Sequence, residues 1–185
     1  MSTPYDLKSA KFLKSLGCVL VALGELDLAE NILNRSYDIR RAHYGENHIK
    51  VLNVLVAKAV LYSAKGKHVK AIDMLKKCKS ITDKLYGKNL IFKAALDINL
   101  GNIYMNIGDK ESARSLLRKG IELFEKNLST NQINLLVSRY SLMKLENNKL
   151  YRVKIENQIK NRLFKSHVYA KIIKDTGGNL FILNT

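Results

Sequence analysis

Three stretches of the chain decide its fold: LGCVLVALGELDLAENIL at 16–33, KAVLYSAKGKHVKAIDML at 58–75 and LGNIYMNIGDKESARSLL at 100–117. They superimpose at a spacing of 42 residues. Each has a glycine at the same place: Gly24, Gly66 and Gly108. Each has an alanine five residues later: Ala29, Ala71 and Ala113. A period of this size is typical of stacked-repeat proteins, whose units bury their apolar faces only against one another.

Within each unit the pattern predicts two helices joined by a tight turn. Apolar residues three and four apart lie on one helical face. The turn glycine adopts positive φ without steric cost and so ends the first helix. Small residues such as Gly17 and Gly101 let two helices approach closely, because a larger side chain would separate them. A single proline, Pro4, leaves long stretches free to be helical. The sequence therefore predicts an all-α chain of stacked antiparallel helix pairs.

The pattern resembles the tetratricopeptide repeat (TPR). Its length resembles the 42-residue units of the kinesin light chain type more than the usual 34 residues. That family's connectors read Leu-Gly, two variable residues, then His-Pro. Residues 44–49, YGENHI, match except for the proline, and residues 86–91, YGKNLI, match in part. The third connector, near 127–131, lacks the glycine. The resemblance covers about residues 10–130 and implies a right-handed α-solenoid acting as a non-catalytic protein–protein interaction module, an adaptor or scaffold.

We expect a TPR-like helical repeat domain over residues 1–166, followed by a helix end and tail at 167–185. Its units lie at about 10–50, 51–92 and 93–130, with a degenerate unit at 131–166. In that last unit Ile155 stands where the period places the alanine, and Leu150 where it places the glycine, although Asn147-Asn148-Lys149 itself reads as a turn. A degenerate final pair is typical of a terminal repeat, because its outer face meets water.

The chain is strongly basic, with a formal net charge of +16, and the excess grows toward the C-terminus. Residues 1–50 hold 7 basic and 6 acidic residues, whereas 127–185 hold 10 and 3. Such a field attracts acidic protein segments, nucleic acid or an anionic membrane surface. A lysine-rich solvated surface with no specific partner is the alternative.

The chain carries no recognisable targeting or disulfide signal. Lys8, Lys11 and Lys14 precede the apolar run 16–23, which resembles a signal peptide, but the run is short and belongs to the first repeat. No segment approaches the roughly 20 apolar residues that span a bilayer. Cys18 and Cys78 lie inside helical patterns, Cys78 at a position that demands a small residue, and they suit a reducing compartment. We therefore expect a cytoplasmic protein.

No catalytic or cofactor chemistry is evident in the sequence. The four histidines (His43, His48, His68 and His167) show no zinc-ligand spacing with the cysteines. Gly66-Lys67 lacks the earlier glycine of a phosphate-binding loop, and Gly177-Gly178 does not lead into a helix. No serine or cysteine sits in a nucleophile elbow. We predict a chain that is not an enzyme and that uses no cofactor or metal.

The first helix of each pair is expected to line the concave face of the array. The predicted peptide-binding groove residues are Lys11, Lys14, Asn53, Asn99, Asn102 and Met105. Spacing also places apolar residues there, including Cys18, Val56, Val60, Ala95 and Ile98. Lysines would pair with carboxylates of an acidic or mixed peptide, and asparagine amides with its backbone. The resemblance implies a ladder of paired asparagines, of which only Asn99 is present, because Ser15 and Ala57 occupy the equivalent positions.

Two alternatives remain open for these residues. Lys11 and Lys14 would be solvated surface, and Asn99 and Asn102 would be ordinary helix-surface polarity. A different function is a basic surface that binds RNA or an anionic membrane through the C-terminal helices. Its residues would be Lys149, Arg152, Lys154, Lys160, Arg162 and Lys165. A third interpretation is a regulatory array attached to a further domain.

Overall fold

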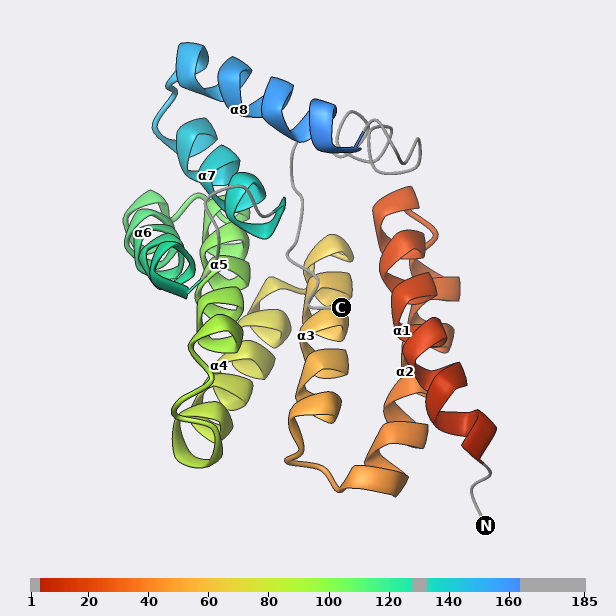
Figure 1. Cartoon of the computed structure of the whole chain (residues 1–185). Coiled ribbons are helices and arrows are strands. Elements are labelled where there is room, and N and C mark those ends of the chain that lie inside the picture. The colour runs from red at the N-terminus through yellow and green to blue at the C-terminus, as the bar shows by residue number, and fades with distance from the viewer. Residues whose placement is uncertain (1–3, 128–132, 164–185) are drawn as a thin grey trace. The chain divides into compact units, whose positions relative to one another are not determined.

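The computed structural model describes residues 4–127 and 133–163, and Figure 1 shows their helices in order along the chain. These are α1 (Pro4–Leu23), α2 (Leu26–Tyr44), α3 (Ile49–Ala64), α4 (His68–Leu85), α5 (Leu90–Asn106), α6 (Lys110–Asn127), α7 (Ile133–Leu145) and α8 (Lys149–Leu163). Strands are absent from these described residues, so the all-α prediction is confirmed there. The predicted tail, 167–185, lies outside them.

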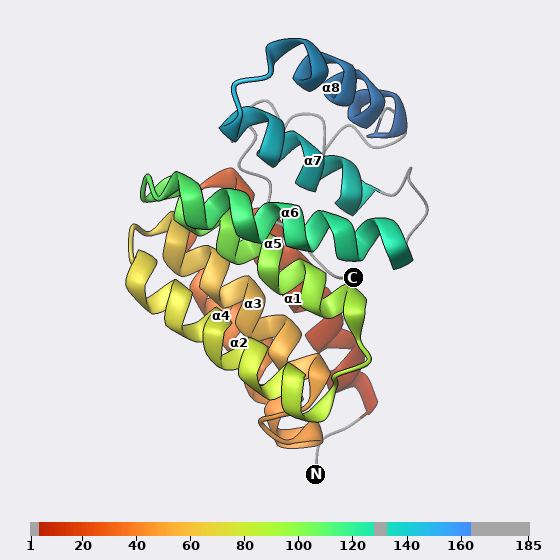
Figure 2. The same cartoon turned by 90° about the vertical axis from the view of Figure 1, so that its left-hand side faces the viewer.

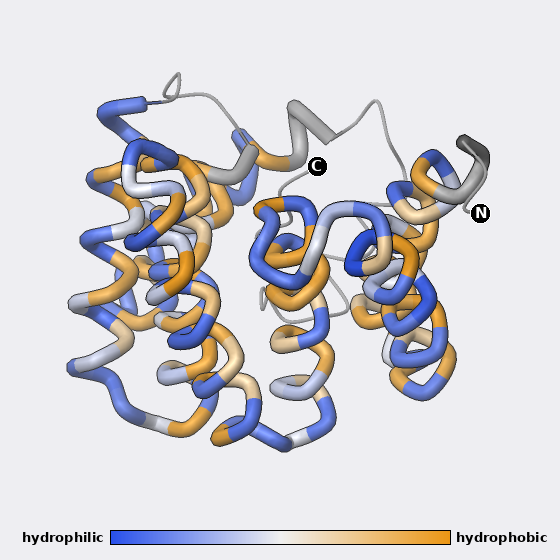
Figure 3. Tube along the Cα trace, turned by 90° about the horizontal axis from the view of Figure 1, so that it is seen from below, coloured by the Kyte–Doolittle hydropathy of each residue, from blue (hydrophilic) through white to orange (hydrophobic). Residues whose placement is uncertain are grey.

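The helices form two compact units, α1–α4 and α5–α8, here called the N-terminal and C-terminal units. In each unit consecutive helices pack on one another, and α1 also contacts α3. Figure 2 shows α7 lying between α6 and α8 within the C-terminal unit. Figure 3 shows hydrophobic and hydrophilic positions recurring along each helix, the periodicity from which the helix pairs were predicted.

The turns that join the two helices of a pair share one pattern of backbone hydrogen bonds. After α1, Gly24 N–H donates to Val21 O at 3.2 Å and Glu25 N–H donates to Leu20 O at 3.0 Å. This 5→2 and 6→1 pairing is the Schellman motif, whose turn residue needs positive φ. The glycines meet that need, with φ of 83° at Gly24, 74° at Gly66 and 87° at Gly108. The prediction that these glycines end the first helices is confirmed.

The fourth turn uses the same motif with a different residue at a different place. Asn147, at φ 55°, donates its N–H to Lys144 O at 3.3 Å, and Asn148 N–H donates to Met143 O at 3.0 Å. Asparagine tolerates the left-handed region better than other non-glycine residues, because its side chain is short and polar. The turn therefore falls three residues earlier than the 42-residue period places it.

Placing Leu150 at the turn position of the fourth unit is wrong, because Leu150 lies inside α8 and is 86% exposed. Placing Ile155 at the alanine position is also wrong. Ala113 N–H donates to Asp109 O, and the equivalent bond at the start of α8 runs from Arg152 N–H to Asn148 O. Arg152 thus occupies the alanine position, and the buried Ile155 lies three residues further along, packed with Ile159 against α7.

Small residues bring the paired helices into contact, as predicted. Ala29, Ala71 and Ala113 are fully buried, and Cys78 is 1% exposed. Between α1 and α2, a Cβ at Gly17 would lie 2.6 Å from Leu33 Cγ. Ser36, which stands at the position of Cys78 in the repeat, donates its Oγ hydrogen to Ala10 O at 2.7 Å. This bond satisfies a polar group that would otherwise be costly to bury.

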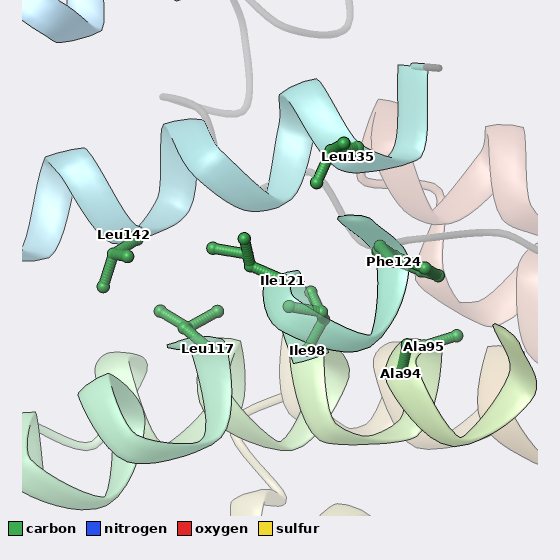
Figure 4. Close-up of a cluster of buried hydrophobic side chains, with 8 residues drawn as sticks. All are labelled: Ala94, Ala95, Ile98, Leu117, Ile121, Phe124, Leu135 and Leu142. Carbon is green, nitrogen blue, oxygen red and sulfur yellow. The ribbon is translucent and has the colours of Figure 1, made fainter. Parts of the chain in front are cut away.

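The core of the C-terminal unit joins three helices. Figure 4 shows side chains of α5, α6 and α7 meeting in one cluster. Its members are Ala94, Ala95, Ile98, Leu117, Ile121, Phe124, Leu135 and Leu142. Gly120 of α6 admits α5 to this core, because a Cβ there would lie 2.6 Å from Ile98 Cδ1 and 2.9 Å from Ala94 O.

Candidate functional site

In the N-terminal unit, the predicted peptide-binding residues lie on the neighbouring helices α1 and α3. Lys11 and Asn53 occupy the same repeat position, one on each helix. Lys11 is exposed and Asn53 is partly buried. Together they place an ammonium group and an amide on adjacent first helices. Both groups can donate hydrogen bonds, to a carboxylate or to a peptide carbonyl.

Lys14 differs from Lys11, although the two lie within one turn of α1. It is only 4% exposed, so the alternative of a solvated surface lysine is wrong for Lys14, whereas the exposure of Lys11 agrees with it. Burial lowers the pKa of Lys14, because desolvation penalises the ammonium form. One turn later Cys18 is also buried, and desolvation raises its pKa to about 11.

In the C-terminal unit, Asn99 and Asn102 are buried, at 0% and 2% exposure, and Met105 is partly buried. The alternative of ordinary helix-surface polarity is therefore wrong for both asparagines. Asn99 Nδ2 donates to Ala95 O at 2.9 Å, one turn back along α5. The polar atoms of Asn99 thus lie inside the structure, where the helix backbone holds part of the amide.

Ala95 and Ile98, which spacing places on the groove, belong to the core cluster instead. Ile98 is fully buried and packs with Leu117, Ile121 and Leu135. On α3 the same holds for Val56 and Val60, which are 5% and 3% exposed. The position shared by Lys11 and Asn53 is consequently the part of the predicted groove that retains accessible polar side chains in the N-terminal unit.

A polar contact between α2 and α3 was not predicted. Lys65 Nζ donates to Asp27 Oδ1 at 2.7 Å and to Glu30 Oε2 at 2.5 Å. Tyr62 OH donates to Glu30 Oε1 at 3.2 Å. Hydrogen bonds from Lys65 lower the pKa of both carboxylates. No local pattern marks this contact, because its partners are at least 32 residues apart in sequence.

The predicted basic surface is described only in part. Lys149 and Lys154 are exposed on α8, and Arg152 is partly buried. Lys154 Nζ lies 5.9 Å from the ring centroid of Tyr151, which is 49% exposed. The side chains of Lys160 and Arg162, and the whole of Lys165, lie outside the described residues.

Residues 4–127 and 133–163 contain no group of three or more His, Cys, Asp or Glu side chains placed to hold a metal. The same segments contain no helix long and apolar enough to cross a membrane. Cys18 and Cys78 are free and buried, and burial raises the pKa of Cys78 to about 12. Thiols with such raised pKa values are poor nucleophiles, because the reactive thiolate is scarce at neutral pH.

Paired helices with Schellman turns, small residues at the contacts and a 42-residue period define a repeat protein of the α-solenoid class. A family model described as tetratricopeptide repeat matches residues 9–84 and 51–126. Together the matches cover more than half of the chain, and the chain belongs to the tetratricopeptide repeat family. Members of this class generally serve as non-catalytic scaffolds for protein interaction.

Solved structures share the fold. One is a crystal structure of nearly identical TPR-like repeats from a Podosopora anserina protein assigned as a kinesin light chain, with a TM-score of 0.63 and 19% identity. The alignment covers 96% of this chain and 90% of that one. A point variant of the same repeats gives a TM-score of 0.62 at 18% identity over 95% and 90% of the two chains. The apo form of RapI gives 0.58 at 18% identity, over 90% of this chain and 46% of that one. No curated protein sequence matches the chain.

Proposed function

We propose that the N-terminal unit binds an extended peptide segment of a partner protein, acidic or mixed in charge, along the face that carries Lys11 and Asn53. The observation that carries the proposal is their equivalence. One repeat position presents an accessible polar side chain on two first helices that lie side by side. An extended peptide crossing both helices would meet an ammonium group and then an amide.

The charges favour an acidic ligand. Lys11 and Lys8 are both exposed on α1. Lys14 is buried on the same helix, so its ammonium group lies beneath that surface. A carboxylate approaching Lys11 would therefore experience the field of all three lysines. Asn53 would supply the hydrogen bonds that hold a peptide backbone in register.

In this proposal the other predicted groove residues have supporting roles. Lys14, Asn99 and Asn102 are buried, so they shape the first helices from within and do not make the first contact with a peptide. Met105 is partly buried on α5 and would offer an adaptable apolar contact within the C-terminal unit.

The test is affinity capture from an extract with the full chain as bait, comparing the wild type with Lys11→Glu and Asn53→Ala. Lys76→Glu is the matched control, because Lys76 is exposed on the second helix α4 and its substitution makes the same charge change. We expect partners recovered by the wild type and by the control to be lost from Lys11→Glu and reduced in Asn53→Ala. Unchanged recovery with both groove variants would argue against this face.

A second candidate function is anion binding by α8, favoured by the exposure of Lys149 and Lys154 beside the half-exposed Tyr151. RNA or an anionic membrane would be held through phosphate contacts, and binding would weaken steeply with salt. A gel shift with generic RNA and a flotation assay with anionic vesicles, each at low and moderate salt, test it. No binding of either ligand at low salt would remove this function.

A further inference from the structure

The face by which α3 packs on α2 reappears on α1, where the helices among the described residues leave much of it accessible. On α3 this face includes Lys58 and Tyr62, and it extends to Lys65, the residue directly after the helix. Lys58 Nζ lies 4.8 Å from the ring centroid of Tyr37 on α2, and Lys65 Nζ bonds Asp27 of α2 at 2.7 Å. Val54 and Leu61, on the same side of α3, are fully buried. This face is therefore the contact that one repeat makes with the second helix of the repeat before it.

Forty-two residues earlier, the equivalent positions on α1 are all apolar: Phe12, Leu16, Val19, Leu20 and Leu23. Leu20 is buried, at 9% exposure, and we call the other four residues the α1 stripe. Phe12 is 66% exposed and Leu23 is 55% exposed, while Leu16 and Val19 are partly buried. Within the described residues α1 packs on α2 and α3, and both leave the stripe open. The α1 stripe thus continues the repeat's own interface, and no helix of the described residues covers it.

The spacing of the stripe suits a second copy of the same helix. Its members follow one another at intervals of four, three and four residues. Reversing the direction of the helix gives the same intervals, so Phe12 maps onto Leu23 and Leu16 onto Val19. An antiparallel pair of identical helices related by a two-fold axis needs this self-complementarity. If Phe12 of one copy contacts Leu23 of the other, then Leu23 of the first copy must also contact Phe12 of the second. These intervals also keep all four side chains on one narrow face.

The charges around the stripe favour the same arrangement. Lys8, four residues before Phe12, is exposed near one end of α1, and Glu25 is exposed just beyond the other end. Antiparallel pairing brings Lys8 of one copy toward Glu25 of the other. Residues 1–50 have a net charge of only +1, with 7 basic and 6 acidic residues, whereas the rest of the chain holds 25 and 10. The N-terminal end is thus where two copies of so basic a chain repel each other least.

We propose that the α1 stripe is a self-association surface, through which two copies of this chain pair with their α1 helices antiparallel about a two-fold axis. The pairing leaves Lys11 and Asn53 available on a different side of the first helices. Loss of the dimer and loss of peptide binding are therefore separate outcomes, produced by different variants.

The test is the mass of the full chain in solution, measured by sedimentation equilibrium over a range of concentrations. We expect the wild type to dimerise, and Phe12→Glu and Leu23→Glu each to weaken the dimer about tenfold or more, because each places a charge in an apolar contact. Val69→Glu is the control, because Val69 is 74% exposed on α4 and should tolerate the same change. Circular dichroism checks that each variant is folded. A wild type that stays monomeric, or a dimer that survives both stripe variants, would overturn the proposal.

Cross-linking tests the direction of pairing. Mixed Phe12→Cys and Leu23→Cys copies should form a disulfide between unlike copies in preference to like ones, because antiparallel helices bring these positions together. The native Cys18 and Cys78 are buried and should not compete. Preferential linking of like copies, or a dimer broken by Leu150→Glu and not by Phe12→Glu, would show another interface and overturn the antiparallel pairing.

Discussion

Gly17 lies against Leu33 so closely that a Cβ at position 17 would stand 2.6 Å from the Leu33 Cγ. The same relationship recurs between α5 and α6, where a Cβ at Gly101 would stand 2.9 Å from Leu117 Cγ and 3.2 Å from Ala113 O. In both cases a leucine four residues after the repeat's alanine packs onto a glycine of the preceding helix. The contact sets the separation of the paired helices.

Gly17→Ala is therefore expected to destabilise the chain, by about 1–3 kcal/mol from overpacking, less the roughly 1 kcal/mol that alanine gains over glycine in a helix. Leu33→Ala alone should also destabilise, because Leu33 is fully buried. The double variant should be less unstable than the two changes summed, since removing the leucine relieves the clash. Urea denaturation of the four proteins measures this coupling, and additive losses would contradict the contact.

Asn147 offers a test of the fourth turn. Its φ of 55° is one that glycine adopts freely and alanine does not. We expect Asn147→Gly to match or exceed the wild type in thermal stability, and Asn147→Ala to lose about 1–2 kcal/mol. The control is Asn148→Gly at the next position. If Asn147→Ala lost no more stability than Asn147→Gly, the assignment of the left-handed turn conformation to position 147 would be wrong.

The contact of Lys65 with Asp27 and Glu30 predicts a loss of stability in acid. Hydrogen bonds from Lys65 hold the pKa of each carboxyl below its usual value of 3.8 or 4.5. Because the pKa of each carboxyl is depressed in the folded state, its contribution to folding stability is fully present above the unfolded pKa. That contribution disappears as the pH falls through the folded pKa. The loss of stability should therefore occur at pH values below about 4.

In Lys65→Met the melting temperature should depend less on pH in the acid range and should be lower than that of the wild type at neutral pH. Thermal melts from acid to neutral pH measure this dependence. Lys76→Met, at an exposed lysine of α4, is the control and should keep the wild-type profile. If the melting temperature of Lys65→Met fell in acid as steeply as that of the wild type, other carboxylates would be the cause of the loss.

The two cysteines should report on local opening. Burial raises the pKa of Cys18 to about 11 and that of Cys78 to about 12, so the thiolate is scarce at neutral pH. We expect both thiols to react with an alkylating reagent far more slowly in the native chain than in urea. Mass spectrometry of the labelled peptides separates the two sites. Rapid native labelling of either would show that its helix pair opens readily.

Much of this fold could be predicted, because turns and close contacts leave local marks. The glycines at the first three turns and Gly17 were recognisable from residue type and period alone. The fourth turn was visible in Asn147-Asn148-Lys149, yet the period misplaced it by three residues. A period describes what the units share, and the last unit is shorter, so local turn chemistry was the better guide.

The candidate site was harder to predict, because burial is set by packing and not by spacing on one helix. Asn99, Asn102 and Ile98 fit a groove by position but are all buried. One signal could have shown this. Apolar residues of α5 occur on nearly every side of the helix between 92 and 103, and a helix of that kind is buried. The bonds of Lys65 to α2 had no such signal, since they depend on which helices meet.

Salt should separate the two proposed interactions of the N-terminal unit. Peptide binding at Lys11 is an attraction between opposite charges, and it should weaken as salt rises from low to physiological concentration. Dimerisation through the α1 stripe is mainly apolar, and the repulsion between two copies of net charge +16 outweighs the attraction between exposed charges at the ends of the two helices. It should therefore strengthen over the same range, because salt screens that repulsion. Sedimentation equilibrium and peptide anisotropy at matched salt concentrations measure both trends. A dimer that weakens with salt would mean that charges, and not the apolar stripe, hold the two copies together.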